Sequence, residues 1–381
     1  MDFAWSNEQL ELREAAKNFA LAELNDGVRE RDQRSEFNLE GWRKCADFGI
    51  HGLPIPVDYG GMGADTLTTV AVLESLGYGC VDNGLIFSVN AHMWTLEVPL
   101  LNFGSKEQKA RYLPLLCSGT IIGGNAMTES GSGSDAYSLQ TTAERRRDKY
   151  VLNGSKIFVS NGSIGDLIVV YATTDRSLGP NGICGFLVER NFSGFQVGKP
   201  LEKMGLRTSP MAELFFDNCE VPVDNRLGTE RSGKSLFAHS MNWERACILA
   251  SAVGAMQRLL EKSIQYARDR KQFGQAIGKF QLVASKIVDM KMRVDQSRAA
   301  LYQTAWLQST GKSTFLEAAL VKLTISENWV RCAEDAIQIH GGYGYMVESE
   351  VERELRDALG SKLYSGTSEI QRVIAASLLG L

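Results

Sequence analysis

The stretch KYVLNGSKIFVSNG, residues 149–162, marks the point at which the chain changes from helical to strand-like spacing. Asn153-Gly154 within it is a typical two-residue turn between strands, so we expect two strands joined across this pair. Three further strand-like runs follow at short intervals, with Gly, Pro and Asp between them. They are LIVVYATT (167–174), GICGFLVE (182–189) and AELFFDN (212–218). Together these runs predict a small β-domain over residues 121–230.

The chain before this segment has helical signals. Ser6 with Gln9, and Ser105 with Gln108, fit the pattern of capping boxes, in which two side chains satisfy the first backbone N–H groups of a helix. Residues 1–120 are therefore expected to form an all-α domain.

Helical spacing returns after residue 230. Apolar residues recur at intervals of three, four and seven, as one face of an antiparallel bundle helix requires. They are Val283, Ile287, Met290, Val294 and Leu301. The order of helices, sheet and helical bundle predicts an α+β fold with domains at 1–120, 121–230 and 231–381.

The composition is that of an ordinary globular protein. The 381 residues are 44% apolar and 23% charged, and 41 basic against 45 acidic side chains leave a net charge of −4. The charges are spread without a basic block, so nucleic acid is not expected as a partner. No apolar run reaches the length of a membrane span, and the polar N-terminus lacks the features of a signal peptide. We expect a cytoplasmic location without membrane contact.

Cysteine and histidine give no indication of a metal site. The seven cysteines are scattered and form no Cys-x-x-Cys pair, which indicates reduced thiols and neither a disulfide framework nor a zinc site. The four histidines, at positions 51, 92, 239 and 340, have no ligand spacing, so we expect packing roles for them.

Seven motifs distributed along the chain resemble those of the acyl-CoA dehydrogenase family. In chain order they are PVDYGGMG (56–63), AMTESGSGSD (126–135), NGSKIFVSNG (153–162), EKMGLRTS (202–209), RKQFGQAIGKFQ (270–281), QIHGGYGY (338–345) and LYSGTSEIQR (363–372). The resemblance covers nearly the whole chain. It implies an N-terminal α-domain, a middle β-domain and a C-terminal four-helix bundle, assembled as a homotetramer with FAD as cofactor.

The loop GSGSDA (131–136) has the form of a dinucleotide fingerprint, but the sequence after it indicates strand and turn, so we reject a Rossmann site. In the family this stretch holds the flavin ring, through small residues, backbone N–H groups and hydroxyls. The resemblance carries these contacts to Met127, Thr128, Gly133 and Ser134, and to Phe158 and Ser160 on the next strands. Without the family, the two motifs would indicate only a Gly/Ser loop and a β-hairpin.

The motif RKQFG (270–274) would by itself mark a helix end, with Gly274 as its cap. In the family its arginine binds the pyrophosphate of an FAD held by a neighbouring subunit, which suits a fixed cation of bidentate geometry. Arg270 is the candidate. The resemblance implies further cofactor contacts at Gln272, Phe273, Gln281, Gln338, Gly341, Gly342, Thr367 and Glu369.

The C-terminal motif departs from the family at one residue. Ser365 stands where most members keep the glutamate that removes the α-proton of an acyl thioester, and a hydroxyl cannot do this unaided at neutral pH. One branch, with isovaleryl-CoA dehydrogenase as its type, keeps the base in a Glu-Arg pair on a bundle helix, and HSMNWERACILA (239–250) offers Glu244-Arg245 there. The apolar neighbours would raise the pKa of Glu244 toward that of a working base. The alternative is an exposed helical carboxylate paired with a cation.

The resemblance also implies how the substrate is held. The thioester carbonyl would accept from the backbone N–H of residue 365, and the expected substrate-binding residues are Ser134, Arg245, Ser365 and Gly366. SMNWE together with YSGTSEIQ is similar to the dehydrogenases and oxidases that act on prolyl groups tethered to a peptidyl or acyl carrier protein in natural-product biosynthesis. The electron acceptor would be oxygen or an electron-transferring flavoprotein.

Three other interpretations remain open at this point. The first is a short- or branched-chain acyl-CoA dehydrogenase, because CoA and carrier proteins present the same phosphopantetheine arm. The second is a non-catalytic flavin-binding member that serves as an electron carrier or assembly partner. The third is a flavin monooxygenase or nitroalkane-type oxidase on the same fold.

Overall fold

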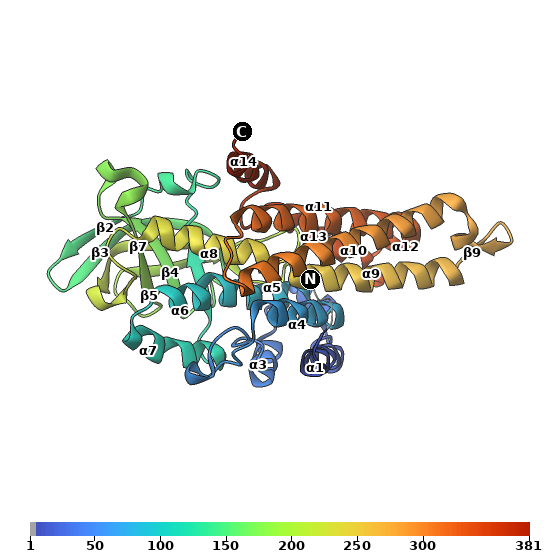
Figure 1. Ribbon diagram of the computed structural model, residues 1–381, viewed down its shortest axis with the longest axis horizontal. Helices are drawn as coiled ribbons and strands as arrows, with labels where there is room; N and C mark the ends of the chain where they lie inside the picture. The colour runs from blue at the N-terminus through green and yellow to red at the C-terminus, as the bar shows by residue number, and fades with distance from the viewer. Residues whose placement is uncertain (1–4) are drawn as a thin grey trace.

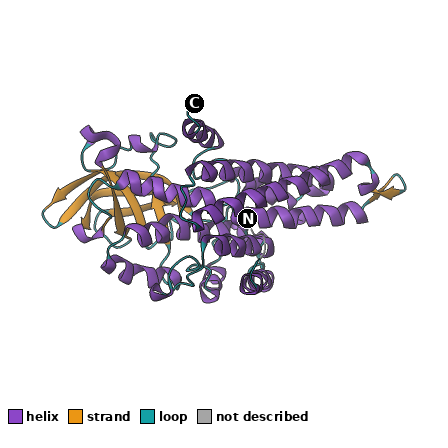
Figure 2. Cartoon of the chain, viewed as in Figure 1, coloured by secondary structure: helices purple, strands orange, loops and turns teal. Residues whose placement is uncertain are grey.

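The computed structural model describes residues 5–381 and has three parts (Figure 1). A β-sheet occupies one end of the long axis, a bundle of long helices extends to the other end, and the N-terminal helices pack beside both (Figure 2). This arrangement confirms the expected α+β fold, with a sheet between two helical segments of the chain.

The N-terminal part is helical throughout. Its helices are α1 (Asn7–Glu23), α2 (Val28–Arg34), α3 (Leu39–Phe48), α4 (Thr66–Gly79), α5 (Asn83–His92), α6 (Val98–Phe103) and α7 (Lys106–Cys117), with a π-helical turn at Met93–Glu97. Both expected capping boxes are present. Ser6 Oγ accepts from the Gln9 N–H at 3.2 Å, and Ser105 Oγ accepts from the Gln108 N–H at 3.1 Å. These bonds fix where α1 and α7 begin.

The middle part is one sheet with the strand order β6-β7-β3-β2-β4-β5-β8, and β1 pairs in parallel with β4. The strands are β1 (Gly123–Ala126), β2 (Thr142–Arg146), β3 (Lys149–Ser160), β4 (Leu167–Thr173), β5 (Ile183–Glu189), β6 (Phe195–Pro200), β7 (Met211–Pro222) and β8 (Arg226–Leu227). Every residue of β4 is buried, so the sheet is covered on both faces at its centre.

The hairpin expected at Asn153-Gly154 is wrong. β3 runs without a break through this pair and is bonded to β7, with a shift of register between Leu152 and Gly154. The Asn-Gly pair therefore lies in a β-bulge, where Gly154 has φ 146°. A Cβ at this glycine would lie 2.6 Å from Thr141 Oγ1. Close packing inside a long strand, and not a turn, requires the glycine.

The C-terminal part is a helical bundle. Its helices are α8 (Gly233–Cys247), α9 (Ala250–Asp269), α10 (Gln281–Ser309), α11 (Phe315–His340), α12 (Gly342–Tyr345), α13 (Val351–Ser361) and α14 (Ser368–Leu378). A small hairpin of β9 (Lys271–Gln272) and β10 (Gln275–Ala276) joins α9 to α10 at the far end of the bundle (Figure 1). The predicted apolar face of α10 packs on the core, with Met290, Val294 and Leu301 fully buried and Val283 and Ile287 partly buried.

Two glycines set the contact between α4 and α9. A Cβ on Gly77 would overlap the Ser251 carbonyl, and one on Gly254 would overlap the Glu74 carbonyl. The two backbones therefore touch without a side chain between them, and the Glu74 carboxylate beside them accepts from Arg298 Nε at 2.7 Å. This contact fixes the N-terminal helices against the bundle.

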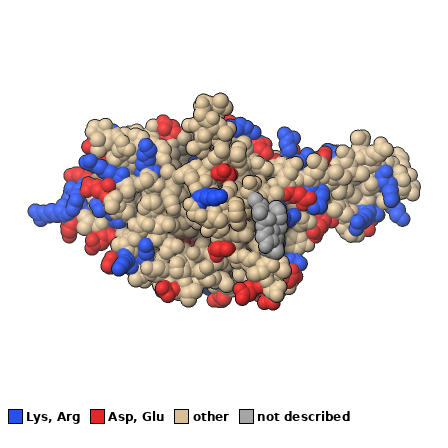
Figure 3. Space-filling model, viewed as in Figure 1, with Lys and Arg blue, Asp and Glu red and all other residues tan. Residues whose placement is uncertain are grey.

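Within residues 5–381, none of the helices combines the length and the apolar character that crossing a bilayer requires. Basic and acidic side chains are interspersed over the face of the molecule shown in Figure 3, so charge on that face changes sign over short distances.

Candidate active site

Glu244 and Ser365 meet where α8 passes the turn between α13 and α14. Ser365 Oγ donates a hydrogen bond to Glu244 Oε1 at 2.5 Å, and Glu244 is only 6% exposed. Burial raises the pKa of the Glu244 carboxyl, while the Ser365 hydroxyl, Arg245 and Lys322 act in the opposite direction. The second oxygen, Oε2, has no hydrogen-bond partner among the described residues. Glu244 is thus a buried carboxylate with an open acceptor, and not an exposed, ion-paired helical residue.

The turn that carries Ser365 has an unfavourable backbone conformation. Ser365 has φ 57° and Gly366 has φ 88°, and a residue other than glycine stays in this region only when its surroundings hold it there. Arg245 Nε donates to the Ser365 carbonyl at 3.2 Å, and Gln371 Nε2 donates to the Ser365 and Gly366 carbonyls at 3.0 and 2.9 Å. Lys322 Nζ donates to the Gly366 carbonyl at 2.7 Å. The Ser365 N–H, by contrast, has no acceptor within residues 5–381.

The sequence interpretation missed Lys322 and Gln371. Lys322 lies at helical spacing from Ala318, Ile325 and Trp329, which are all buried, so a lysine at a core position is the signal that could have revealed it. Gln371 is fully buried as well, but nothing in its local pattern distinguishes it from an exposed glutamine.

Aromatic rings gather beside the face of α8 that carries Glu244. Phe237 lies two turns before Glu244 on the same helix face, and its ring centroid is 5.8 Å from that of Tyr137 and 5.4 Å from that of Tyr171. The Glu244 charge contributes to a raised pKa of Tyr171, after the larger effect of burial. Apolar and aromatic surroundings disfavour the charged form of a carboxyl group, in the direction seen for the pKa of Glu244.

Neighbouring strands bring together several of the residues expected to hold a flavin ring. The Ile157 N–H donates to the Thr128 carbonyl at 2.9 Å, and Lys156 Nζ donates to the Met127 carbonyl at 3.0 Å. The chain after β1 therefore lies beside the end of β3, where Ser160 is the last residue of the strand. Phe158, two residues before Ser160 in β3, has a backbone φ of 58°. Its side chain is 59% exposed, so the ring is available to a ligand.

Gly133 and Ser134 lie in an exposed loop between β1 and β2. A Cβ on Gly133 would meet nothing within 4 Å, so packing within the chain does not require the glycine. The base of the loop is held by Glu129, whose Oε1 accepts from the buried Lys156 Nζ at 2.7 Å. A single 3-10 turn and then β2 follow the loop, which confirms that GSGSDA is not a Rossmann fingerprint.

A second group of expected cofactor residues lies at the far end of the bundle. Arg270, Gln272, Gly341 and Gly342 line one hollow of about 580 Å³, together with aromatic residues that include Tyr343. The Arg270 guanidinium carbon is 5.9 Å from the centroid of the Tyr343 ring. The lining of this hollow therefore combines the Arg270 cation, the Gln272 amide and the two glycines.

RKQFG is more than the helix end that its local pattern indicates. α9 ends at Asp269, and the motif forms the turn of the β9-β10 hairpin, where Phe273 and Gly274 have φ 51° and 80°. Phe273 is 94% exposed at the tip of this hairpin. Gln281 and Gln338 are also exposed, and neither lines the hollow.

Thr367 and Glu369 lie at the start of α14. Thr367 Oγ1 accepts from the Ile370 N–H at 3.2 Å as the helix N-cap, and Glu369 is exposed in the first turn. Helix capping accounts for the position of Thr367, and a cofactor role for both residues stays a prediction.

The flavin-ring residues and the Arg270 hollow lie toward opposite ends of the molecule. The sheet is at one end of the long axis and the β9 hairpin at the other (Figure 1). α10, which begins near the hairpin, has 29 residues, or about 43 Å at 1.5 Å per residue. The residues predicted to hold one cofactor are therefore divided within a single chain.

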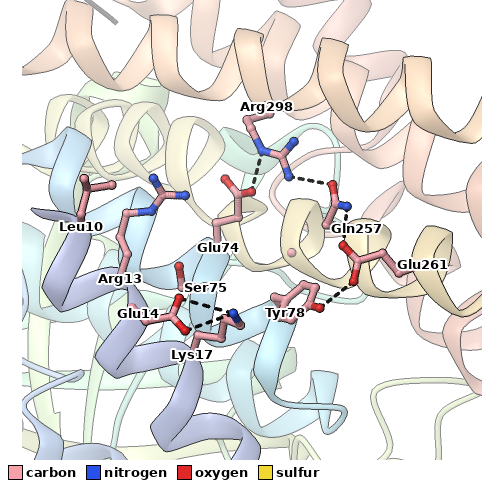
Figure 4. A pocket seen from close by; sticks show the side chains of 11 residues that line it. Leu10, Arg13, Glu14, Lys17, Glu74, Ser75, Tyr78, Gln257, Glu261 and Arg298 are labelled. Carbon is pink, nitrogen blue, oxygen red and sulfur yellow. Dashed lines mark hydrogen bonds and ion pairs between the residues drawn. The ribbon is translucent and has the colours of Figure 1, made fainter. Parts of the chain in front are cut away.

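Another hollow, of about 370 Å³, lies between α1, α4, α9 and α10 (Figure 4). It contains none of the expected site residues. Several of its polar groups bond to one another: Tyr78 Oη donates to Glu261 Oε2 at 2.6 Å, and Gln257 Nε2 donates to Glu261 Oε1 at 2.7 Å. This hollow is a largely paired polar contact between helices.

Comparison with known proteins identifies the class to which this fold and site belong. Models of the acyl-CoA dehydrogenase N-terminal, middle and C-terminal domains match residues 6–120, 124–219 and 231–379. The chain belongs to the acyl-CoA dehydrogenase family.

Among its relatives are L-prolyl-peptidyl-carrier-protein dehydrogenases of Pseudomonas fluorescens and of a Serratia species. The first is 42% identical over 91% of both chains, and the second is 39% identical over 100% of this chain and 99% of the relative. The crystal structure of the prolyl acyl carrier protein oxidase AnaB is 53% identical, covers 99% of this chain and 100% of its own, and has a TM-score of 0.98. The structure of PigA with FAD and proline is 39% identical over the whole of both chains, also with a TM-score of 0.98.

Proposed function

We propose that this protein is an FAD-dependent oxidoreductase that removes hydrogen from the α and β carbons of a prolyl thioester carried by a peptidyl or acyl carrier protein. The observation that carries the proposal is the buried Glu244 carboxylate, bonded to Ser365 and open at Oε2. The named activities of the relatives support the prolyl group and the carrier.

The residues present fit FAD. Beside the sheet, the exposed Phe158 ring, the Thr128 and Ser160 side chains and the open loop at Gly133 offer an apolar surface with hydroxyl and backbone donors. At the far hollow, Arg270 supplies a fixed cation, and Gly341-Gly342 allow a phosphate or ribose to approach the backbone. A PigA structure is described as a complex with FAD, which supports the same cofactor here.

FAD, when bound, accepts the hydride that leaves the β-carbon. Glu244 Oε2 takes the α-proton, since this oxygen has no partner in the described chain. The Ser365 hydroxyl holds Oε1 and orients the carboxylate. The free Ser365 N–H donates to the thioester carbonyl and stabilises the negative charge that develops there. Arg245 donates to the Ser365 carbonyl and so holds the same turn. Gly366 adopts the positive φ that the turn requires.

The remaining predictions complete the proposal. The division of the FAD-binding residues between opposite ends of the molecule favours an oligomer in which Arg270 serves a neighbour's cofactor, and membership of the family favours a homotetramer. The domain boundaries lie near residues 120 and 230. Ser134 contacts the substrate. The electron acceptor is oxygen or an electron-transferring flavoprotein. A cytoplasmic location and a role in natural-product biosynthesis follow from the same assignment.

Prolyl-loaded carrier protein is expected to bleach the flavin under anaerobic conditions much faster than free proline. Free proline lacks the thioester that acidifies the α-proton and the arm that fills the channel. The measurement is stopped-flow absorbance of the flavin, with a panel of acyl-CoA thioesters and unloaded carrier protein as controls. Intact mass of the product would show the loss of two or four hydrogens. Reduction by a simple acyl-CoA and none by prolyl-carrier protein would move the assignment to short- or branched-chain acyl-CoA oxidation.

A further inference from the structure

Lys322 is a buried amine directly behind the catalytic turn. It lies on α11 with no exposed surface, between Val321 and Ile325 of the core. Nζ makes one hydrogen bond within the described chain, to the Gly366 carbonyl at 2.7 Å, and lies 5.8 Å from the centroid of the Tyr364 ring. Burial of an ammonium group with so little compensation costs stability. A residue that costs stability at this place calls for a functional explanation.

We propose that Lys322 is a positioning residue, which holds the Ser365-Gly366 turn in its catalytic conformation and supplies a positive charge that keeps the Glu244 carboxyl ionised. The inference rests on the proposed function, because it assigns Lys322 a part in the same proton transfer.

The first step of the argument is geometric. The Ser365 carbonyl accepts from Arg245 and Gln371, and the Gly366 carbonyl accepts from Gln371 and Lys322. Because each peptide group is planar, fixing two successive carbonyls fixes two successive peptide planes. These donors come from α8, α11 and α14, and together they determine a backbone that Ser365 would otherwise leave. Loss of the Lys322 bond leaves the Gly366 carbonyl with its Gln371 donor alone, and therefore loosens the turn that carries the Ser365 hydroxyl.

The second step concerns charge. Burial lowers the pKa of Lys322 to about 7, an effect that the Glu244 carboxylate opposes. The other charged groups that face the amine are Arg245 from α8, Glu327 from α11 itself and Glu369 from α14. Reciprocally, the positive charge of Lys322 lowers the pKa of Glu244. Below about pH 7 the amine is charged and favours the basic form of the carboxylate.

Two substitutions separate the hydrogen bond from the charge. Lys322→Met removes both, whereas Lys322→Gln keeps an N–H donor for the Gly366 carbonyl and removes only the charge. Lys203→Met is the matched control, because Lys203 Nζ also donates to backbone carbonyls of a turn, those of Leu206 and Ser209, and burial lowers its pKa to about 8. Lys203 makes no hydrogen bond to the catalytic turn.

The FAD-loaded variants are compared by anaerobic flavin reduction with prolyl-carrier protein as a function of pH. We expect Lys322→Met to reduce the rate by about 10- to 100-fold and to move the acid limb of the profile upward by about one pH unit, because Glu244 loses a neighbouring cation. Lys322→Gln should recover most of the rate but keep the shifted acid limb. Lys203→Met should leave the acid limb where it is in the wild type.

Thermal unfolding supplies a readout independent of activity. Lys322 binds its proton less tightly in the folded chain, with a pKa of about 7 against the ordinary 10.5. The unfolded chain therefore holds more protons between these values, and the stability of the wild type rises with pH across this window. Lys322→Met lacks this rise, so the difference in Tm, wild type minus variant, should increase from pH 7 toward pH 10.

Several outcomes would overturn the inference. If both Lys322 variants reduce the flavin at the wild-type rate with an unshifted acid limb, Lys322 has a packing role only. A Tm difference that stays constant from pH 7 to pH 10 would overturn the assignment of a desolvated, titrating amine. If the wild type is not reduced by prolyl-carrier protein, the proposed function fails, and the same profiles are measured with the acyl-CoA that does reduce it. If no thioester reduces the flavin, both proposals are wrong.

Discussion

Glu244→Gln retains its fold and its FAD but loses nearly all flavin reduction by the thioester substrate. Removal of a general base typically costs ~10²–10⁴-fold in rate, and glutamine has the shape of glutamate without its basicity. The amide oxygen can still accept from the Ser365 hydroxyl, which now bonds Oε1 at 2.5 Å, so the turn is expected to stay in place. Stopped-flow absorbance of the flavin under anaerobic conditions measures the effect, and the flavin-to-protein ratio checks that the cofactor is retained.

A buried carboxylate elsewhere in the chain provides a matched control. Glu97 is fully buried, and burial raises its pKa as well, but it lies in the π-helical turn beside His92. Glu97→Gln should therefore leave flavin reduction near the wild-type rate. A comparable loss in both variants would show that the effect of Glu244→Gln reflects general damage to the fold.

Ser365 provides the complementary test. Ser365→Ala keeps the backbone N–H and removes only the bond that orients Glu244, so its loss of rate should be much smaller than that of Glu244→Gln. Glu244→Gln combined with Ser365→Glu is expected to recover part of the activity, because the two side chains are in contact. Full activity in Glu244→Gln together with none in Ser365→Ala would refute the assignment of the base.

The parts of the fold that depend on local patterns could be predicted from the sequence. The capping boxes at Ser6 and Ser105 and the apolar face of α10 follow from contacts between residues three to seven positions apart. The Asn153-Gly154 pair shows where local patterns are insufficient. Its dipeptide is typical of a turn, but pairing of β3 with β7, about sixty residues further along the chain, keeps the strand continuous and makes a bulge.

The candidate site divides in the same way. The Glu-Arg pair at 244–245 and the departure at Ser365 can be recognised in the sequence, whereas the bond between them joins residues 121 positions apart. The core position of Lys322 on α11 can also be recognised in the sequence, but the roles of Lys322 and Gln371 appear only when α11 and α14 pack against the turn. Burial of Glu244 is likewise a property of packing, because the turn that contacts it belongs to a distant part of the chain.

Arg270→Ala is expected to lower FAD occupancy while leaving the chain folded. The Arg270 side chain makes no hydrogen bond or ion pair within residues 5–381 and contacts the Tyr343 ring at 5.9 Å, so its loss costs the fold little. Loss of a hydrogen bond to a charged phosphate costs about 1.5–3 kcal/mol, or about 10- to 100-fold in FAD affinity. The ratio of flavin to protein absorbance after purification, and titration of the apoprotein with FAD, measure the change. Lys271→Ala, which removes an exposed cation from the same hairpin, is the control and should bind FAD nearly as the wild type does.

A mixed oligomer tests whether Arg270 acts on a neighbour. Chains with Arg270→Ala and chains with Glu244→Gln, each impaired alone, are co-expressed with different tags and purified as mixed assemblies. Suppose that Arg270 of one chain completes the cofactor site of another. The Arg270→Ala chain then supplies Glu244 and receives an intact arginine from a Glu244→Gln neighbour. A fraction of the sites has both wild-type residues, so flavin reduction returns. If Arg270 served its own chain, every site would lack either the base or the arginine, and mixing would restore nothing. A monomeric protein in solution, or an absence of recovery in verified mixed assemblies, would contradict the shared site. The division of the binding residues along the roughly 43 Å of α10 leads us to expect recovery.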